Sequence, residues 1–168
     1  MKTNKYKSYI NHSRYGKVSM NNGYKYSLEE VHNSFWLYSY VTVFPKSTIP
    51  ADTSKQRYCV FPRKLYVDIE KICKKCHGKF LFFALEQKYW YEVLGFYIDV
   101  DCVKCIECRK AEQKIKEKAL RYEELIKNKN RTNREIKDLK YVAYALYEIG
   151  YLKNKSKLAQ ILKLKEVQ

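Results

Sequence analysis

The chain has 168 residues, of which 34 are Lys or Arg and 18 are Asp or Glu, giving a net charge of +16. Apolar residues make up 46%, enough for one moderate domain with helical additions, and 17 tyrosines supply much of that share. No run of 18 apolar residues occurs and no apolar segment lies near the start, which argues against a membrane span and a secretory signal. We expect a cytoplasmic protein with no membrane partner, whose cysteines stay reduced.

The N-terminal segment, residues 1–48, is predicted to be a basic, tyrosine-rich arm followed by a helix and a strand. Residues 1–26 are polar and fit a weak hairpin or a mobile arm equally well. Ser27 and Glu30 have the spacing of a capping box and predict the start of a helix. One face of that helix carries the apolar side chains Leu28, Val31, Phe35 and Tyr38.

The stretch after this helix predicts a strand and then a loop. Residues 41–44 are rich in β-branched side chains, so we expect a short strand that ends at Pro45. Residues 45–64 contain all three prolines of the chain and are interpreted as an extended, ordered loop. Cys59 lies in this loop without a partner nearby in the sequence, and we interpret it as a small buried apolar side chain.

Cysteine spacing is the most informative feature of the sequence. Cys73 and Cys76 form one C-x-x-C pair, and both Cys102/Cys105 and Cys105/Cys108 qualify as a second pair. Two such pairs supply the four thiolates that structural zinc prefers. We favour Cys73, Cys76, Cys105 and Cys108, because Cys108 lies where a long helix starts and a helix N-terminus stabilises a thiolate. Cys102 remains the alternative ligand.

The segment between the two cysteine pairs predicts a buried strand and a helix. Residues 79–83 form a short apolar run, and residues 84–94 change to a helical period that ends at Gly95. On that helix Glu86 and Glu92 are expected to be solvated or to pair with Lys88. His77 follows Cys76 directly and is expected to point away from the metal, as a solvated or supporting residue.

The C-terminal region after Cys108 is helical in pattern. Ala111, Ile115, Ala119, Tyr122 and Ile126 line one face of a helix that ends near Lys127. A second capping box, Thr132 with Glu135, starts another helix that Gly150 closes, and Ser156 is expected to cap a last short helix. We therefore predict a helical hairpin over residues 111–150.

The cysteine-rich region resembles the bacterial "probable zinc-ribbon domain" family over residues 49–110. The similarity is carried by Ile49–Gln56, Tyr66-Val67-Asp68, the Ala-x-x-Gln-x-x-Trp-Tyr-Glu helix of residues 84–92, and Lys104–Lys110. The resemblance implies one structural zinc held by Cys73, Cys76, Cys105 and Cys108. This chain departs from the family in having His77 before Gly78 and in the extra Cys102.

These features predict an α+β fold with a small four-cysteine zinc-ribbon or treble-clef-like core, an inserted helix and a C-terminal helical hairpin. The expected domains are residues 1–48, a zinc-ribbon-like domain over 49–110 and a basic α-helical extension over 111–168. The gap of 28 residues between Cys76 and Cys105 is longer than a bare ribbon needs, and the helix around Trp90 fills it.

The favoured function is a non-catalytic accessory protein that binds RNA or DNA through its basic flanks. The alternative is a protein-interaction or structural module that uses the hairpin of residues 111–150, including self-association. A closed site of four cysteines and the absence of a catalytic motif argue against an enzyme, and no small-molecule substrate is evident. The candidate nucleic-acid-binding residues are Lys74, Lys75, Lys104, Arg109, Lys110, Lys114 and Arg121, with Tyr6, Tyr9 and Tyr15 on the arm.

Overall fold

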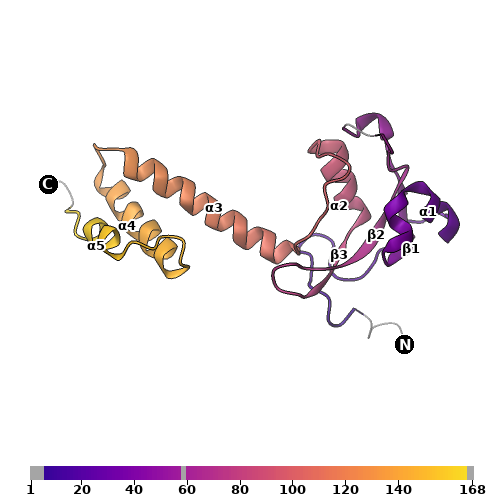
Figure 1. Ribbon diagram of the computed structural model, residues 1–168, viewed down its shortest axis with the longest axis horizontal. Coiled ribbons are helices and arrows are strands. Elements are labelled where there is room, and N and C mark those ends of the chain that lie inside the picture. The colour runs from indigo at the N-terminus through magenta and orange to yellow at the C-terminus, as the bar shows by residue number, and fades with distance from the viewer. Residues whose placement is uncertain (1–5, 58–59, 166–168) are drawn as a thin grey trace. The chain divides into compact units, whose positions relative to one another are not determined.

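The computed structural model describes residues 6–57 and 60–165, which form two compact units. Unit 1 is Met1–Arg109 and unit 2 is Lys110–Gln168 (Figure 1). Cys59 lies outside the described residues. The predicted α+β class is confirmed, because a small antiparallel sheet is combined with helices. The predicted domain boundary at residue 48 stays a prediction.

The first helix, α1 (Leu28–Ser34), starts where the capping box predicts. The backbone N–H of Glu30 donates to Ser27 Oγ at 3.1 Å, and the N–H of Ser27 donates to the Glu30 carboxylate at 2.7 Å. The helix is shorter than expected and a 3₁₀ turn, η1 (Trp36–Tyr40), follows it. Val31 and the rings of Phe35 and Tyr38 are buried as predicted, whereas Leu28 is exposed.

Three antiparallel strands form a sheet in the order β1-β2-β3. Their bounds are β1 (Val43–Pro50), β2 (Leu65–Ile72) and β3 (Lys79–Phe82). The predicted end of β1 at Pro45 is wrong, since the strand continues to Pro50. Two features accommodate these prolines: β1 is an edge strand, and its register with β2 is irregular between Phe44 and Ile49. The predicted loop therefore begins after Pro50, and β2 was not predicted.

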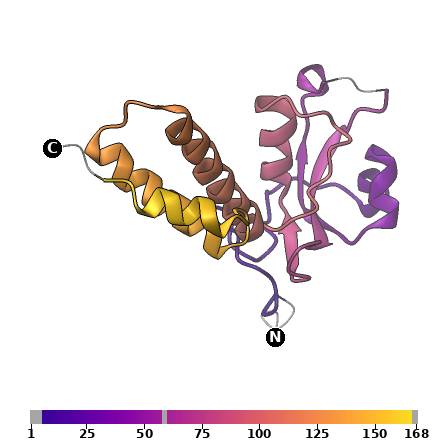
Figure 2. The ribbon, with the colours of Figure 1, turned by 60° about the vertical axis from the view of Figure 1, so that its left-hand side comes forward.

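The helix between the cysteine pairs consists of α2 (Ala84–Lys88) and a π-helical turn, η3 (Tyr89–Val93). The N–H of Leu94 donates to the carbonyl of Tyr89 at 3.0 Å, which is the wider hydrogen-bond spacing of a π turn. Gly95 has φ +64°, the left-handed conformation expected after a helix. The predicted helix and its end are confirmed. Figures 1 and 2 show α1 and α2 on two sides of the sheet.

The N-terminal arm packs on the sheet in the described part of the chain. Tyr9 bridges to Lys79, and the N–H of Ile10 donates to the Lys79 carbonyl at 2.8 Å. Tyr9 is buried with Leu81 and Phe83. Because these contacts join the arm to β3, the arm is part of the fold of unit 1.

Unit 2 is a helical hairpin covered by a third helix. It contains most of α3 (Ile106–Lys127), then α4 (Asn133–Glu148) and α5 (Lys155–Leu162). The predicted Thr132–Glu135 capping box is present, whereas Asn154 rather than Ser156 caps α5. Residues from all three helices share one apolar cluster: Ala119, Tyr122, Leu125, Leu139, Val142, Ala143, Leu146, Leu158 and Ile161.

Candidate metal centre

The first cysteine pair lies on the tight turn that joins β2 to β3. The N–H of Cys73 donates to the Gly78 carbonyl at 3.0 Å, and the N–H of His77 donates to the Cys73 carbonyl at 2.9 Å. The backbone N–H of Lys75 points at Cys73 Sγ, 3.4 Å away. This pattern of N–H groups around sulfur is typical of a metal knuckle, in which a thiolate accepts from the backbone.

The second knuckle joins a short loop to α3. Cys105 precedes the first residue of the helix, and its Sγ lies 3.5 Å from the backbone N–H of Cys108. A sulfur in this place does what an N-cap oxygen does for an ordinary helix. From the sequence we expected Cys108 to lie at the start of the helix. In the structure Cys105 occupies the capping position, and Cys108 lies in the first turn. A backbone bond from Lys74 to the Val103 carbonyl at 2.9 Å ties the two knuckles together.

The four predicted ligands, Cys73, Cys76, Cys105 and Cys108, meet in one cluster. Their sulfurs all lie within 4.8 Å of one another, and Cys76 Sγ is 3.8 Å from Cys105 Sγ. Tetrahedral zinc with Zn–S bonds of about 2.3 Å separates its sulfurs by about 3.8 Å. The donor set and its spacing therefore fit one structural zinc ion, and the four sulfurs would close its coordination sphere.

The thiols of Cys73 and Cys108 differ in how readily they lose a proton. Burial opposes ionisation of Cys73, but backbone hydrogen bonds from Cys76, Cys105 and Lys75 outweigh it and lower the pKa of Cys73 to about 6. Burial and the neighbouring thiols raise the pKa of Cys108 instead. Because zinc binds thiolates, binding at this centre releases the protons that the remaining thiols hold.

The comparisons with known families agree with this geometry. A family described as a probable treble clef domain matches residues 67–117. Residues 67–117 are therefore similar to a treble clef domain, and their four clustered cysteines fit the metal site of such a domain. The matched segment runs from β2 through both knuckles into α3. The match is consistent with the zinc-ribbon-like family that residues 49–110 resemble, and it extends further into α3 than that resemblance does. The comparison with curated proteins gave no match, and the comparison with solved structures gave none either.

Cys102 lies outside the four-sulfur cluster of the treble clef. It is buried in the apolar core of unit 1, and its Sγ lies 3.4 Å from the carbonyl oxygen of Lys104. Burial raises the pKa of this thiol to about 12, so it stays protonated at neutral pH. The alternative pairing of Cys102 with Cys105 is therefore disfavoured by the geometry.

A buried carboxylate supports the second knuckle. Glu86 of α2 accepts a hydrogen bond from the Arg109 guanidinium at 2.6 Å, and its Oε1 is also 3.4 Å from His12 Nε2. Arg109 lies over the ring of Trp90 and donates to the Lys104 carbonyl. The prediction that Glu86 is solvated or pairs with Lys88 is wrong, because α2 turns this side chain into the interior.

The pairing predicted for Lys88 is made by Glu92. Their charged atoms are 3.6 Å apart, and the Glu92 carboxylate also accepts from the backbone N–H of Asp52 at 2.8 Å. His77 is exposed as predicted and has φ +58°. A left-handed backbone is costly for a residue with a Cβ, so His77 occupies a position that glycine would adopt more easily.

The predicted nucleic-acid-binding residues fall into three groups. Lys74, Lys75, Lys110 and Lys114 are exposed, and Lys104 is half-buried. The two arginines are engaged within the protein: Arg109 pairs with Glu86, and Arg121 pairs with Glu124 and Asp138. The arm tyrosines are also engaged.

All three arm tyrosines contact other side chains of unit 1. The Tyr9 hydroxyl donates to the Glu70 carboxylate, and the Tyr6 ring lies against the Tyr9 and Phe44 rings. Tyr15 stacks on His12 at 4.8 Å and also meets Phe83. The arm tyrosines therefore pack the fold, and the expectation that they form a contact surface is wrong for the buried Tyr9.

Proposed function

We propose that this treble clef protein is non-catalytic and binds RNA or DNA through lysines on its helical unit. Four thiolate ligands leave zinc no open position for an activated water, so the metal stabilises the fold. The described residues include no helix with the length and apolar character needed to cross a membrane. Nucleic acid is the partner class that the charge distribution favours.

The main observation behind this proposal is the excess of positive charge on α5 and the residues beside it. Residues 149–165 contain five lysines, all exposed, and no acidic residue: Lys153, Lys155, Lys157, Lys163 and Lys165. Two of these lysines stand in the first turn of α5, where a positive charge opposes the helix dipole. Although Lys157 also lies over the Tyr122 ring, the helix dipole does not favour these charges, and together they concentrate positive potential for a phosphate backbone. The seven candidates named from the sequence did not include these lysines, although the absence of acids was visible there.

The exposed lysines of the treble clef supply a second group of phosphate contacts. Lys74 and Lys75 lie on the turn of the first knuckle, whose backbone is fixed by the cysteine hydrogen bonds. Lys110 and Lys114 lie on exposed positions of α3. These side chains are expected to position a nucleic acid without reading its sequence.

The test is binding of the zinc-loaded protein to labelled RNA and DNA over a salt series that starts at physiological ionic strength. The double variant Lys153→Gln/Lys155→Gln is compared with Lys55→Gln/Lys88→Gln, whose lysines pair with Asp52 and Glu92. Both variants lose the same charge. We expect the first to reduce the slope of log K against log salt by about 2, since each phosphate contact contributes about 0.9. Equal effects of the two variants, or no binding at physiological salt, would overturn the proposal.

A protein partner is the second candidate function. It is favoured by exposed apolar and aromatic side chains on unit 2, namely Leu120, Tyr141, Tyr144, Ile149 and Tyr151. It is weakened by α5, which supplies Leu158 and Ile161 to the cluster that buries the predicted hairpin stripe. A stable dimer in sedimentation, together with no nucleic-acid affinity, would favour this function instead.

A further inference from the structure

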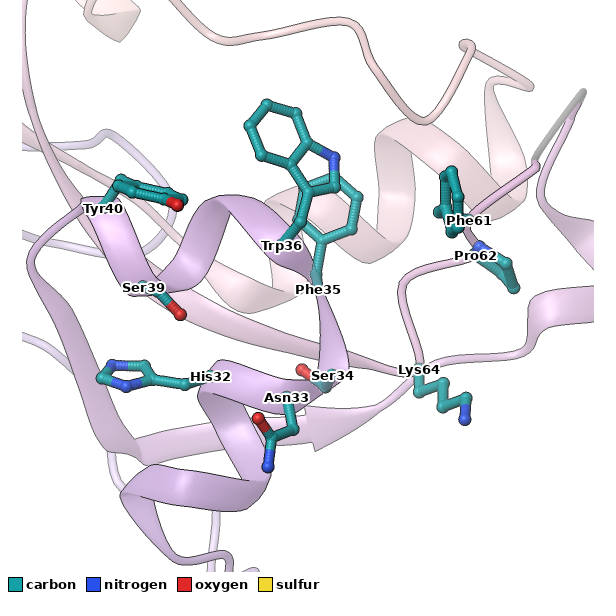
Figure 3. A pocket seen from close by; sticks show the side chains of 10 residues that line it. All are labelled: His32, Asn33, Ser34, Phe35, Trp36, Ser39, Tyr40, Phe61, Pro62 and Lys64. Atoms are coloured by element: carbon teal, nitrogen blue, oxygen red, sulfur yellow. The ribbon is translucent and has the colours of Figure 1, made fainter.

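A hollow on unit 1 is lined by aromatic rings from two separate segments. It has a volume of about 640 Å³, and α1, the 3₁₀ turn η1 and residues 61–64 form its walls. Trp36 and Tyr40 come from η1, and Phe61 comes from the loop before β2 (Figure 3). This hollow lies outside the matched residues 67–117, so the treble clef match assigns it no role.

The three rings are unusually open to solvent. The exposed fractions are 59% for Trp36, 81% for Tyr40 and 71% for Phe61. Tryptophan is normally among the most buried residues on average, and exposed rings gathered in a concave site indicate a contact surface. In Figure 3 the Trp36 and Phe61 side chains project from different segments of the chain.

The base of the hollow is packed against the interior of unit 1. Phe35 is buried beneath Trp36, with ring centroids 5.6 Å apart. Behind Phe35 lies the guanidinium of Arg63, 4.1 Å from the ring centroid, and this group is also buried. Arg63 donates to the Ile98 carbonyl at 2.9 Å, and none of the ion pairs among the described residues involves it. An aromatic ring held against such a support, as Trp36 is, loses little conformational freedom when it binds a ligand.

Lys64 contributes a positive charge to the lining of the hollow, and no lining residue is acidic. A ligand that combines flat aromatic surfaces with negative charge fits this lining, and unpaired nucleotides have both. A duplex keeps its bases stacked inside the helix, so it cannot present them to Trp36 and Phe61 as a single strand can.

We propose that the hollow is a stacking site for unpaired bases of single-stranded RNA or DNA. Bases stack on Trp36 and Phe61, and Lys64 contacts the adjoining phosphate. This inference rests on the proposed function and makes it specific, because it names single-stranded over double-stranded nucleic acid as the ligand of unit 1.

The experiment compares oligothymidylate of about 12 nucleotides with a duplex of the same length, using zinc-loaded full-length protein. The variants are Trp36→Ala, Trp36→Phe and Phe61→Ala. Tyr144→Ala is the control, since Tyr144 is 51% exposed on α4 and lies outside the hollow. The readouts are affinity for each ligand and quenching of tryptophan fluorescence by the single strand. Thermal melting checks that each variant stays folded.

We expect Trp36→Ala and Phe61→Ala to weaken single-strand binding about 5- to 100-fold, because a base stacked on a ring contributes that much. Duplex binding should change little, Trp36→Phe should weaken single-strand binding less than Trp36→Ala, and both Trp36 variants should lose most of the quenching. Tyr144→Ala should match the unchanged protein. Equal losses for both ligands, or no loss for either, would overturn the stacking site while the lysine-based function stands. Absence of all binding at physiological salt would remove the proposed function and this inference together.

Discussion

At the scale of single residues, the Glu86 side chain links α2 to two other segments of unit 1. It contacts His12 of the arm and Arg109 beside the last cysteine, and only 6% of its side chain is exposed. Its second oxygen, Oε2, is buried without a hydrogen-bond partner among the described residues. A buried carboxylate of this kind is retained at a cost in desolvation, so its pairing with Arg109 matters for the position of α3.

Replacing Glu86 with alanine is expected to destabilise the zinc-loaded protein by about 3 kcal/mol. The change leaves the Arg109 guanidinium without its carboxylate in a half-buried place, which costs more than the loss of the pair itself. Urea unfolding measures the change, and Glu123→Ala is the control because Glu123 is exposed on α3. A loss for Glu86→Ala no larger than that of the control would show that Arg109 finds other partners.

Asp68 is expected to titrate near neutral pH. Burial raises the pKa of its carboxyl to about 6, although Ala84, Ser19 and Met20 donate hydrogen bonds to it. The folded protein therefore binds this proton more tightly than the unfolded chain does. The stabilising contribution of the group is complete below about pH 4 and is lost as the pH rises through 6.

The measurement is the pH dependence of unfolding for the unchanged protein and for Asp68→Asn, together with a carboxyl carbon NMR titration. Between pH 7.5 and pH 5 the unchanged protein should gain about 1 kcal/mol relative to the variant. A carboxyl titration midpoint near 4 would contradict the raised pKa.

At the scale of elements, the start of α3 determines which cysteines can bind the metal. Cys105 caps this helix and Cys108 lies in its first turn, whereas Cys102 lies before it in the apolar core. We expect Cys108→Ser to abolish retention of zinc, because three thiolates leave the ion open to water and chelators. Cys102→Ser should keep one zinc per chain, with at most a modest loss of stability. Metal analysis after gel filtration distinguishes them, and the opposite result would assign the ligand role to Cys102.

The elements also show what the sequence can predict. The capping boxes at Ser27 and Thr132, the strand after the first knuckle and the helix ended by Gly95 follow from local patterns, and all were found. β2 was missed because its residues are interrupted by Asp68 and Glu70, whose partners come from distant segments. The continuation of β1 through Pro45 depends on its edge position, which spacing does not show.

For the candidate sites too, local features were predictable from the sequence and tertiary contacts were not. Cysteine spacing predicted the four clustered thiols, since knuckle geometry is local. Engagement of Arg109, Arg121 and Tyr9 inside the protein depends on tertiary contacts. The hollow around Trp36 and Phe61 brings together residues whose exposure no pattern in either segment indicates. Periodicity predicted a continuous helix through Tyr38, and the 3₁₀ turn that presents Trp36 appears only in the fold.

At the scale of the whole molecule, removal of zinc should affect the two units differently. The core of unit 1 includes Cys73 and Cys105, so its packing depends on the geometry of the cluster. Unit 2 has an apolar cluster of its own. We expect chelation to melt α2 and lower the thermal midpoint while part of the far-UV helical signal remains, and added zinc should restore both. An unchanged spectrum and midpoint after verified zinc loss would contradict this.

The four sulfur ligands differ in how far they reach the solvent. Cys73 and Cys105 are buried, Cys108 is half-buried and Cys76 is exposed. A competing chelator or an electrophile in solution therefore meets one thiolate before the others. The lifetime of the bound metal should depend on the concentration of such competitors and on the chemistry of that single sulfur, even where the affinity at equilibrium is set by all four. A centre with this asymmetry holds its ion tightly and still exchanges it by way of its one accessible ligand.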